Sequence, residues 1–121
     1  MLACREESRV KNLCISLRLL DDWLQRVGTH ETLRSCLMQY AQERGQMRME
    51  NIVWGKSRQF WELGRSMDKI GWRRFMEGMI SGKVVAIQKE FVAAGGCNLS
   101  LENWAKGFVI KLLEATHGQW L

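Results

Sequence analysis

The segment LENWAKGFVIKLLEATHGQW, residues 101–120, carries the clearest helical pattern in the sequence. On a helical wheel of 100° per residue, its apolar positions fall in one arc of about 140°. These positions are Leu101, Ala105, Phe108, Val109, Leu112, Leu113, Thr116 and Trp120. Ser100, which precedes the segment, is a favourable N-cap residue. The pattern therefore predicts a long, amphipathic C-terminal helix that supplies much of the core.

A second amphipathic segment lies at the other end of the chain, from about Glu6 to Val27. Its apolar residues recur at spacings of three and four, which places them on one face of a helix. They are Val10, Leu13, Leu17, Leu20, Leu24 and Val27, with Cys14 and Trp23 widening the stripe. Gly28 is suited to ending this helix, because glycine adopts the left-handed conformation at low cost.

The next helix is predicted from His30 to Arg44, with Thr29 as its N-cap and Gly45 at its end. Its inward face consists of Leu33, Cys36, Leu37, Tyr40 and Ala41. Because only a short turn separates the first two helices, we expect them to form an N-terminal helical hairpin.

The middle of the chain is more interrupted. Residues 46–56 mix polar and apolar side chains without a clear period and predict a loop with at most a short helix. A further helix should begin near Ser57 and break at Gly71. A short helix then covers residues 72–80, another runs from Lys83 to about Val92, and residues 93–98 form a loop.

Together these elements predict an all-α protein, a compact bundle of five or six helices formed by a single domain over residues 1–121. No alternating strand pattern occurs, and proline is absent, so nothing in the composition breaks long helices. No apolar run approaches the roughly 20 residues that span a bilayer, and early charges argue against a signal peptide. We therefore expect an intracellular protein that makes no membrane contact.

The residues that could carry chemistry form no recognisable site. Cys4, Cys14, Cys36 and Cys97 contain no CxxC pair, so reduced, packed thiols are preferred to a zinc site completed by His30 or His117. Gly55-Lys56-Ser57 resembles the end of a phosphate-binding loop, but Glu50 occupies the position of the required first glycine. The sequence thus predicts no catalytic residue, no metal, no cofactor and no identifiable small-molecule substrate.

Positive charge is concentrated in residues 44–74. The chain has a net charge of +5, and this window holds the whole excess, with eight basic and three acidic residues. On the predicted third helix, four cations fall within about 80° of one another, opposite the apolar face. They are Arg58, Arg65, Lys69 and Arg73. Backed by Trp61 and Trp72, this stripe has the chemistry to contact phosphates and stack bases, although a solvated basic face is the default interpretation.

Two positions are candidates for docking a partner. The chain ends on Trp120 and Leu121 without a polar tail, which suggests either that this end binds something or that the sequence once continued. Trp54 lies in the irregular segment of residues 46–56 and is the second candidate.

Three motifs resemble a known group of sequences: IGWRRFMEGMIS (residues 70–81), the pair Ile87-Gln88, and WAKGFVIKLLEATHGQWL (residues 104–121). They are similar to a recurrent region in uncharacterised eukaryotic open reading frames, some of which accompany mobile elements and are described as reverse-transcriptase-like. In those sequences the chain continues beyond the position of Leu121, so the resemblance implies a truncated piece. No polymerase carboxylate motif is present, so the resemblance implies no polymerase activity here.

Three functional hypotheses follow. The preferred one is a non-enzymatic helical interaction or scaffold domain that docks a protein partner, or its own copy, through the exposed tryptophans. The alternative is a nucleic-acid-binding module of mobile-element origin that uses the basic helix face within residues 44–74. An enzyme ranks last, because no convergent set of titratable residues can be named.

Overall fold

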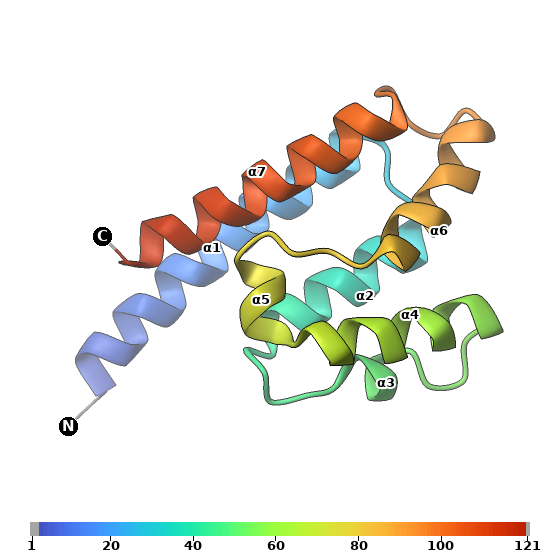
Figure 1. The fold of residues 1–121 in the computed structure, drawn as a ribbon. Helices are drawn as coiled ribbons and strands as arrows, with labels where there is room; N and C mark the ends of the chain where they lie inside the picture. Colours follow the sequence, from blue (N-terminus) through green and yellow to red (C-terminus); the bar gives the residue numbers. More distant parts are fainter. Residues whose placement is uncertain (1–2, 121) are drawn as a thin grey trace.

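The structure is a computed structural model that describes the backbone of residues 3–120 and the side chains of residues 13–115 (Figure 1). Within these residues it contains only helices, so the predicted all-α class is confirmed. The helices are α1 (Ala3–Val27), α2 (Glu31–Gln42), α3 (Met49–Ile52), α4 (Arg58–Ile70), α5 (Trp72–Met76), α6 (Gly82–Ala93) and α7 (Leu101–Trp120). The short α3, in the stretch expected to be mainly loop, accounts for the one helix beyond the predicted five or six.

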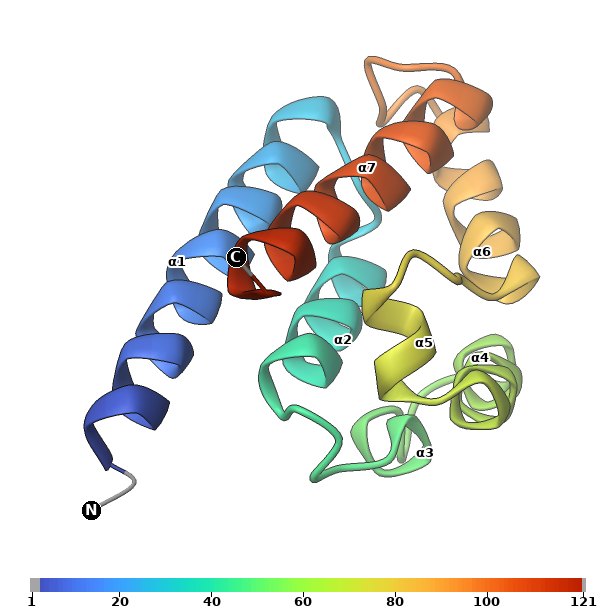
Figure 2. The ribbon, with the colours of Figure 1, turned by 60° about the vertical axis from the view of Figure 1, so that its left-hand side comes forward.

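The two long helices, α1 and α7, lie side by side and run in opposite directions (Figures 1 and 2). The predicted hairpin of α1 and α2 is present, although α1 packs more extensively against α7 than against α2. On the other side of α2 lie α3, α5 and α6, and α4 packs against those three short helices. None of the described helices is both long enough and apolar enough to cross a bilayer.

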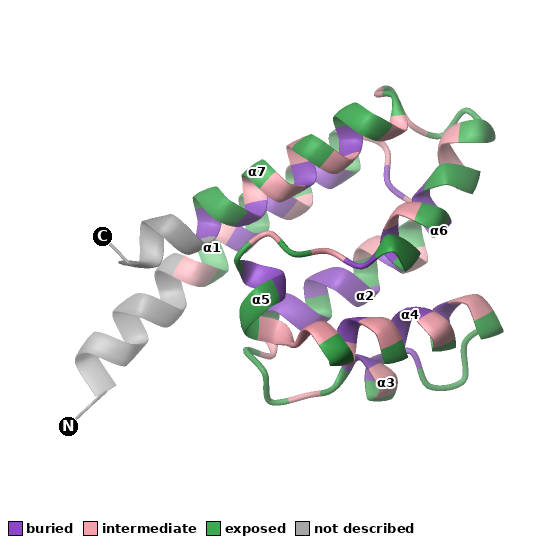
Figure 3. Cartoon of the chain, in the orientation of Figure 1, coloured by how far each residue is buried: buried purple, intermediate pink, exposed green. Residues whose placement is uncertain are grey.

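The core lies between these helices, and the predicted inward faces supply most of it (Figure 3). Leu24, Leu33 and Leu63 are completely buried, one each from α1, α2 and α4. From α7, Trp104 and Phe108 are equally buried, with ring centroids 5.4 Å apart. A domain of this size depends on such burial for its stability, since each fully buried large apolar side chain contributes about 1.5–3 kcal/mol.

Two details of the predicted faces are wrong. Cys14, expected to widen the apolar stripe of α1, is exposed. On α7, Trp104 and Ala115 are buried whereas Leu113 is 44% exposed, so the buried arc is rotated by about 60° from the predicted one. On the side of the buried arc away from Leu113, the indole of Trp23 on α1 packs where a side chain on Gly107 of α7 would stand. The predicted arc positions Thr116 and Trp120 lie outside the described side chains.

The turn between α1 and α2 is held by later parts of the chain. The buried amide of Gln88, on α6, accepts a hydrogen bond from the backbone N–H of His30 and donates one to the carbonyl of Gly28, each over 3.0 Å. The predicted cap is off by one residue, because Nδ1 of His30, rather than Thr29, accepts the N–H of Leu33. Thr29 is instead buried and bonded to α7.

Candidate functional site

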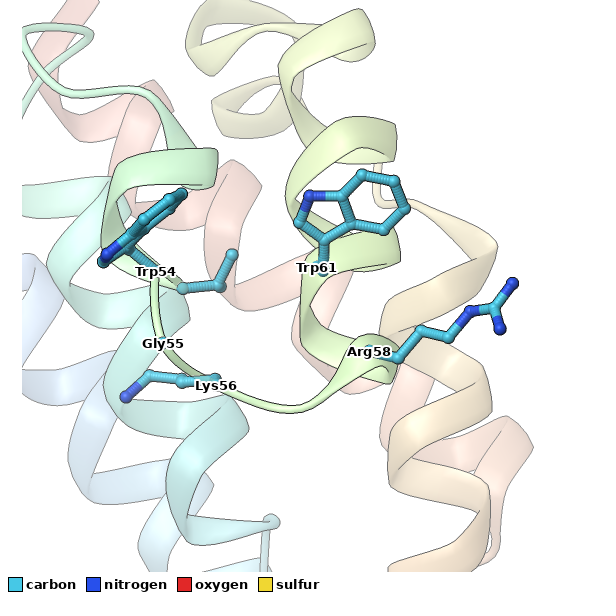
Figure 4. Close-up of a pocket in the computed structure, with 6 residues that line it drawn as sticks. Trp54, Gly55, Lys56, Arg58 and Trp61 are labelled. Carbon is cyan, nitrogen blue, oxygen red and sulfur yellow. The ribbon is translucent and has the colours of Figure 1, made fainter.

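A shallow groove lies between the end of α3 and the start of α4 (Figure 4). Its lining consists of Val53, Trp54, Gly55, Lys56, Arg58 and Trp61. Trp54 follows α3 and is 83% exposed, and Trp61 stands on the first turn of α4 and is 48% exposed. The groove therefore presents two indole rings from two different elements to solvent.

The position of Trp54 depends on how α3 is held. The carboxylate of Asp68, on α4, accepts the backbone N–H of Met49 over 2.8 Å and that of Glu50 over 3.0 Å. These are the first two residues of α3, whose N–H groups have no partner within their own helix. Asp68 thus supplies a cap from a distant part of the chain and ties α3 to α4.

Close packing brings the two walls of the groove together. Gly64 is buried on α4, and a Cβ at this position would lie 2.9 Å from Cγ2 of Val53 and 3.2 Å from Cα of Glu50. Only glycine therefore lets α4 approach α3 this closely. Gly55, with a φ of +81°, then turns the chain out of α3 towards Lys56. The Gly55-Lys56-Ser57 motif is the turn between these two helices.

One cation contacts a groove ring, and two others line the groove. The guanidinium of Arg65 lies over the ring of Trp61, 5.0 Å from its centroid, at the distance of a cation–π contact. In Figure 4, Lys56 and Arg58 extend in opposite directions away from the two indoles. Glu62, the nearest acid on α4, is paired with Arg58 and with Lys83, each over 3.5 Å. No acidic residue is among those that line the groove.

The predicted cationic stripe is only partly continuous. Arg58, Arg65 and Lys69 are exposed on α4. Arg73 lies on α5 instead, because Gly71, with a φ of +89°, ends α4. The placement of all four on one helix was therefore wrong. Trp72 is also not free to stack on a base, because it packs against the core and its indole nitrogen donates to the carbonyl of Ala41 over 3.0 Å.

Of the predicted docking residues, Trp54 is exposed, while Trp120 and Leu121 lie outside the described side chains. The prediction missed the pairing of Trp54 with Trp61 and the place of Lys56 beside them. The stretch WGKSRQFW, residues 54–61, contains the signal, since two basic residues lie there between aromatic ones.

Five large apolar side chains outside the groove are also exposed, on α1, on α7 and in the segment after α5. They are Ile15, Leu19, Met79, Ile110 and Leu113, each 44–63% exposed. Leu19 lines a small hollow with Lys111 and Ala115 of α7. Leu113 had been expected on the buried face of its helix.

His30 and Cys36 are packed among other side chains of the fold. His30 caps α2 and packs against the rings of Phe60 and Phe91, at centroid distances of 5.8 and 5.9 Å. Burial raises the pKa of the Cys36 thiol, which keeps it in its unreactive protonated form. Among the side chains that the structure describes, no three His, Cys, Asp or Glu residues are grouped to hold a metal ion. Cys4 and His117 lie outside the described side chains.

Comparison with protein-family models, with curated proteins and with solved structures finds no match for this chain. The motifs behind the mobile-element resemblance include residues with clear packing roles. Gln88 and Trp104 hold the α1–α2 turn, and Phe75 is buried between Tyr40 and Phe108. A functional assignment must therefore come from the geometry of the exposed surface.

Proposed function

We propose that this chain is a non-enzymatic binding domain that docks an anionic macromolecule in the groove between Trp54 and Trp61. The observation that carries the proposal is the exposure of Trp54 among cations. Tryptophan is the side chain with the most apolar area to gain from burial, and it is enriched where partners bind. A partner that covers Trp54 removes this area from water.

The shape of the groove favours a macromolecule over a small ligand. Small-molecule sites bury about 70–90% of their ligand. Here Trp54, Lys56 and Arg58 are all exposed, so the walls cannot enclose a small molecule. No carboxylate, histidine or cysteine lines the groove, which supports binding without catalysis.

The charge of the groove favours an anionic partner. Lys56 and Arg58 line it, and Arg65 stacks on one of its two rings. Glu62, which follows Trp61 on α4, is paired with Arg58 and with Lys83. A positive patch steers anionic partners towards itself, and its attraction weakens as salt screens it.

Chromatography on immobilised heparin, a polyanion without aromatic groups, tests this proposal. The variant Lys56→Gln/Arg58→Gln/Arg65→Gln removes three groove charges, and Arg18→Gln/Arg26→Gln/Lys106→Gln removes the same number of exposed charges from α1 and α7. We expect the groove variant to elute at clearly lower salt than the control variant. Equal shifts in both variants would show that only net charge matters and would overturn the proposed site.

A second candidate function rests on the exposed apolar side chains of α1 and α7, of which Ile15 and Leu19 lie one turn apart on one face of α1. Exposed large apolar side chains gain free energy when a partner covers them, so we propose that these helices contact a protein partner or a second copy of the chain. Light-scattering mass across a concentration series tests self-association. The mass should rise with concentration and fall back to that of a monomer in Leu19→Lys/Ile110→Lys. A constant monomer mass in the unmodified chain would contradict self-association.

A further inference from the structure

We infer that the anionic partner is a single strand of nucleic acid, with unpaired bases stacked on Trp54 and Trp61. In this arrangement the phosphates contact the surrounding cations, Lys56, Arg58 and Arg65. The inference rests on the proposed groove and names the chemical class of its ligand.

The two rings provide the stacking surfaces. Trp54 is largely exposed, so its indole is open to a planar group. The guanidinium of Arg65 covers Trp61 at 5.0 Å, and Trp61 also lines the groove. A base that stacks on Trp61 from the groove would complete a layered arrangement of cation, indole and base. Base–aromatic stacking of this kind tolerates any sequence, because every base has a π-face.

The positions of the charges fit a strand that threads between the rings. Lys56 and Arg58 extend away from the indoles in opposite directions, so they flank the stacking surfaces and do not cover them (Figure 4). Phosphates on either side of a stacked base could therefore meet a cation while the base lies against the tryptophans. Glu62 pairs with Arg58, but Lys83, which is not part of the groove lining, pairs with the same carboxylate and so reduces its repulsion of a phosphate.

The two indoles should make the groove bind a single strand more tightly than other polyanions. In a duplex the faces of the bases are covered by their neighbours, so two indoles in a surface groove gain little from it. An acidic peptide satisfies the cations, but its carboxylates offer no planar face to the rings. Heparin has the same limitation. The pair of exposed indoles, Trp54 and Trp61, is thus the feature that selects unpaired bases.

Fluorescence anisotropy with matched probes tests the inference. One probe is a labelled oligo(dT) of about 12 nucleotides, within the usual size of single-strand sites. The second is an abasic strand of equal length and charge, and the third is the corresponding duplex. We expect the abasic strand to bind roughly 5- to 150-fold more weakly for each base that stacks. We also expect weaker binding of the duplex than of oligo(dT).

Three groove variants and one control variant assign the effect to the groove. Trp54→Ala should reduce affinity for oligo(dT) and shrink the difference between oligo(dT) and the abasic strand, and Trp54→Phe should restore part of both. Because Trp54 is largely exposed, neither change disturbs the core. Ser35→Ala changes an exposed side chain on α2, away from both proposed surfaces, and should change nothing. Log affinity falls with log salt, and Lys56→Gln should make this slope shallower by about 0.7, because one phosphate contact is lost.

The heparin result keeps the outcomes distinct. If oligo(dT), the abasic strand and the duplex bind alike while heparin binding depends on the groove charges, the inference is overturned and the proposed function stands. A polyglutamate peptide that binds more tightly than oligo(dT) also overturns it, in favour of an acidic protein segment. If neither heparin nor any oligonucleotide binds, both the inference and the proposed function are overturned.

Discussion

The indole nitrogen of Trp104 donates a hydrogen bond to the hydroxyl of Thr29 over 2.9 Å, and both side chains are buried. The Thr29 hydroxyl in turn donates to the carbonyl of Leu24 over 3.0 Å. The C-terminal helix is therefore bonded directly to the turn between the first two helices. This bond, together with Gln88, explains why a turn rich in backbone polar groups can be packed inside the bundle.

Replacing Thr29 with valine tests this bond. Valine has nearly the same shape but no hydroxyl, so the buried indole N–H of Trp104 loses its acceptor. We expect the free energy of unfolding in urea to fall by about 1–3 kcal/mol, the cost of an unpaired buried donor. Thr29→Ser keeps the hydroxyl and should lose less. An equal loss in both variants would show that packing of the methyl group, and not the hydrogen bond, stabilises the turn.

A comparison of two glycines tests the contact between the α1–α2 turn and the loop before α7. Gly28 and Gly95 have similar positive φ values, +91° and +85°. A Cβ on Gly28 would overlap the carbonyl oxygen of Gly96, whereas a Cβ on Gly95 would meet open space. Gly95→Ala should therefore cost about 1 kcal/mol of backbone strain, and Gly28→Ala about 3 kcal/mol or more. Equal losses in thermal unfolding would contradict this close approach.

Asp68 does not line the groove, yet Asp68→Ala should weaken the binding of oligo(dT). The variant leaves the N–H groups of Met49 and Glu50 without their acceptor, so α3 and the attached Trp54 are held less firmly. Removing a negative charge would by itself strengthen the binding of an anion, so the two effects have opposite signs. We expect lower affinity for oligo(dT) and faster hydrogen exchange of the Met49 and Glu50 amides. Unchanged exchange with stronger binding would contradict the positioning role of Asp68.

The raised pKa of Tyr40 predicts how the stability of the fold changes at alkaline pH. Burial, with a smaller contribution from the negative charge of Asp68, raises the pKa of Tyr40 from 10.0 to about 12. The fold thus favours the neutral phenol, and this stabilisation is fully present below pH 10 and lost as pH rises through about 12. The loss is on the order of 1–3 kcal/mol. Because Tyr40 is the single tyrosine, ultraviolet titration reports it alone. A midpoint near 10 in the folded protein would contradict its burial.

The helices that sequence periodicity predicted are those with a repeated apolar face. The faces of α1 and α2 could be found because each helix makes at least three turns and buries a stripe of side chains. The helix α3 could not, since its four residues contain no period and its cap, Asp68, follows 18 residues after Glu50. Similarly, the capping role passed from Thr29 to His30 because Trp104, far away in sequence, binds the Thr29 hydroxyl.

The candidate site was accessible from sequence only in parts. The basic residues and Trp54 could be named from composition and from their irregular context. Their arrangement depends on tertiary contacts, because Gly64 and Asp68 bring the end of α3 against α4. The break at Gly71 was predicted from the residue type, yet the cationic stripe was drawn across it to Arg73. A local break removes any common helical phase for the residues on either side of it.

The most direct test of the groove as the binding site is the response of the tryptophan indole N–H signals to oligo(dT) in a nitrogen–proton correlation spectrum. The chain contains six tryptophans, and Trp54→Phe and Trp61→Phe identify the two groove signals. We predict that these two shift during the titration, while the buried Trp104, bonded to Thr29, stays in place. Shifts confined to the other tryptophans, with Trp54 and Trp61 unchanged, would contradict the groove as the site.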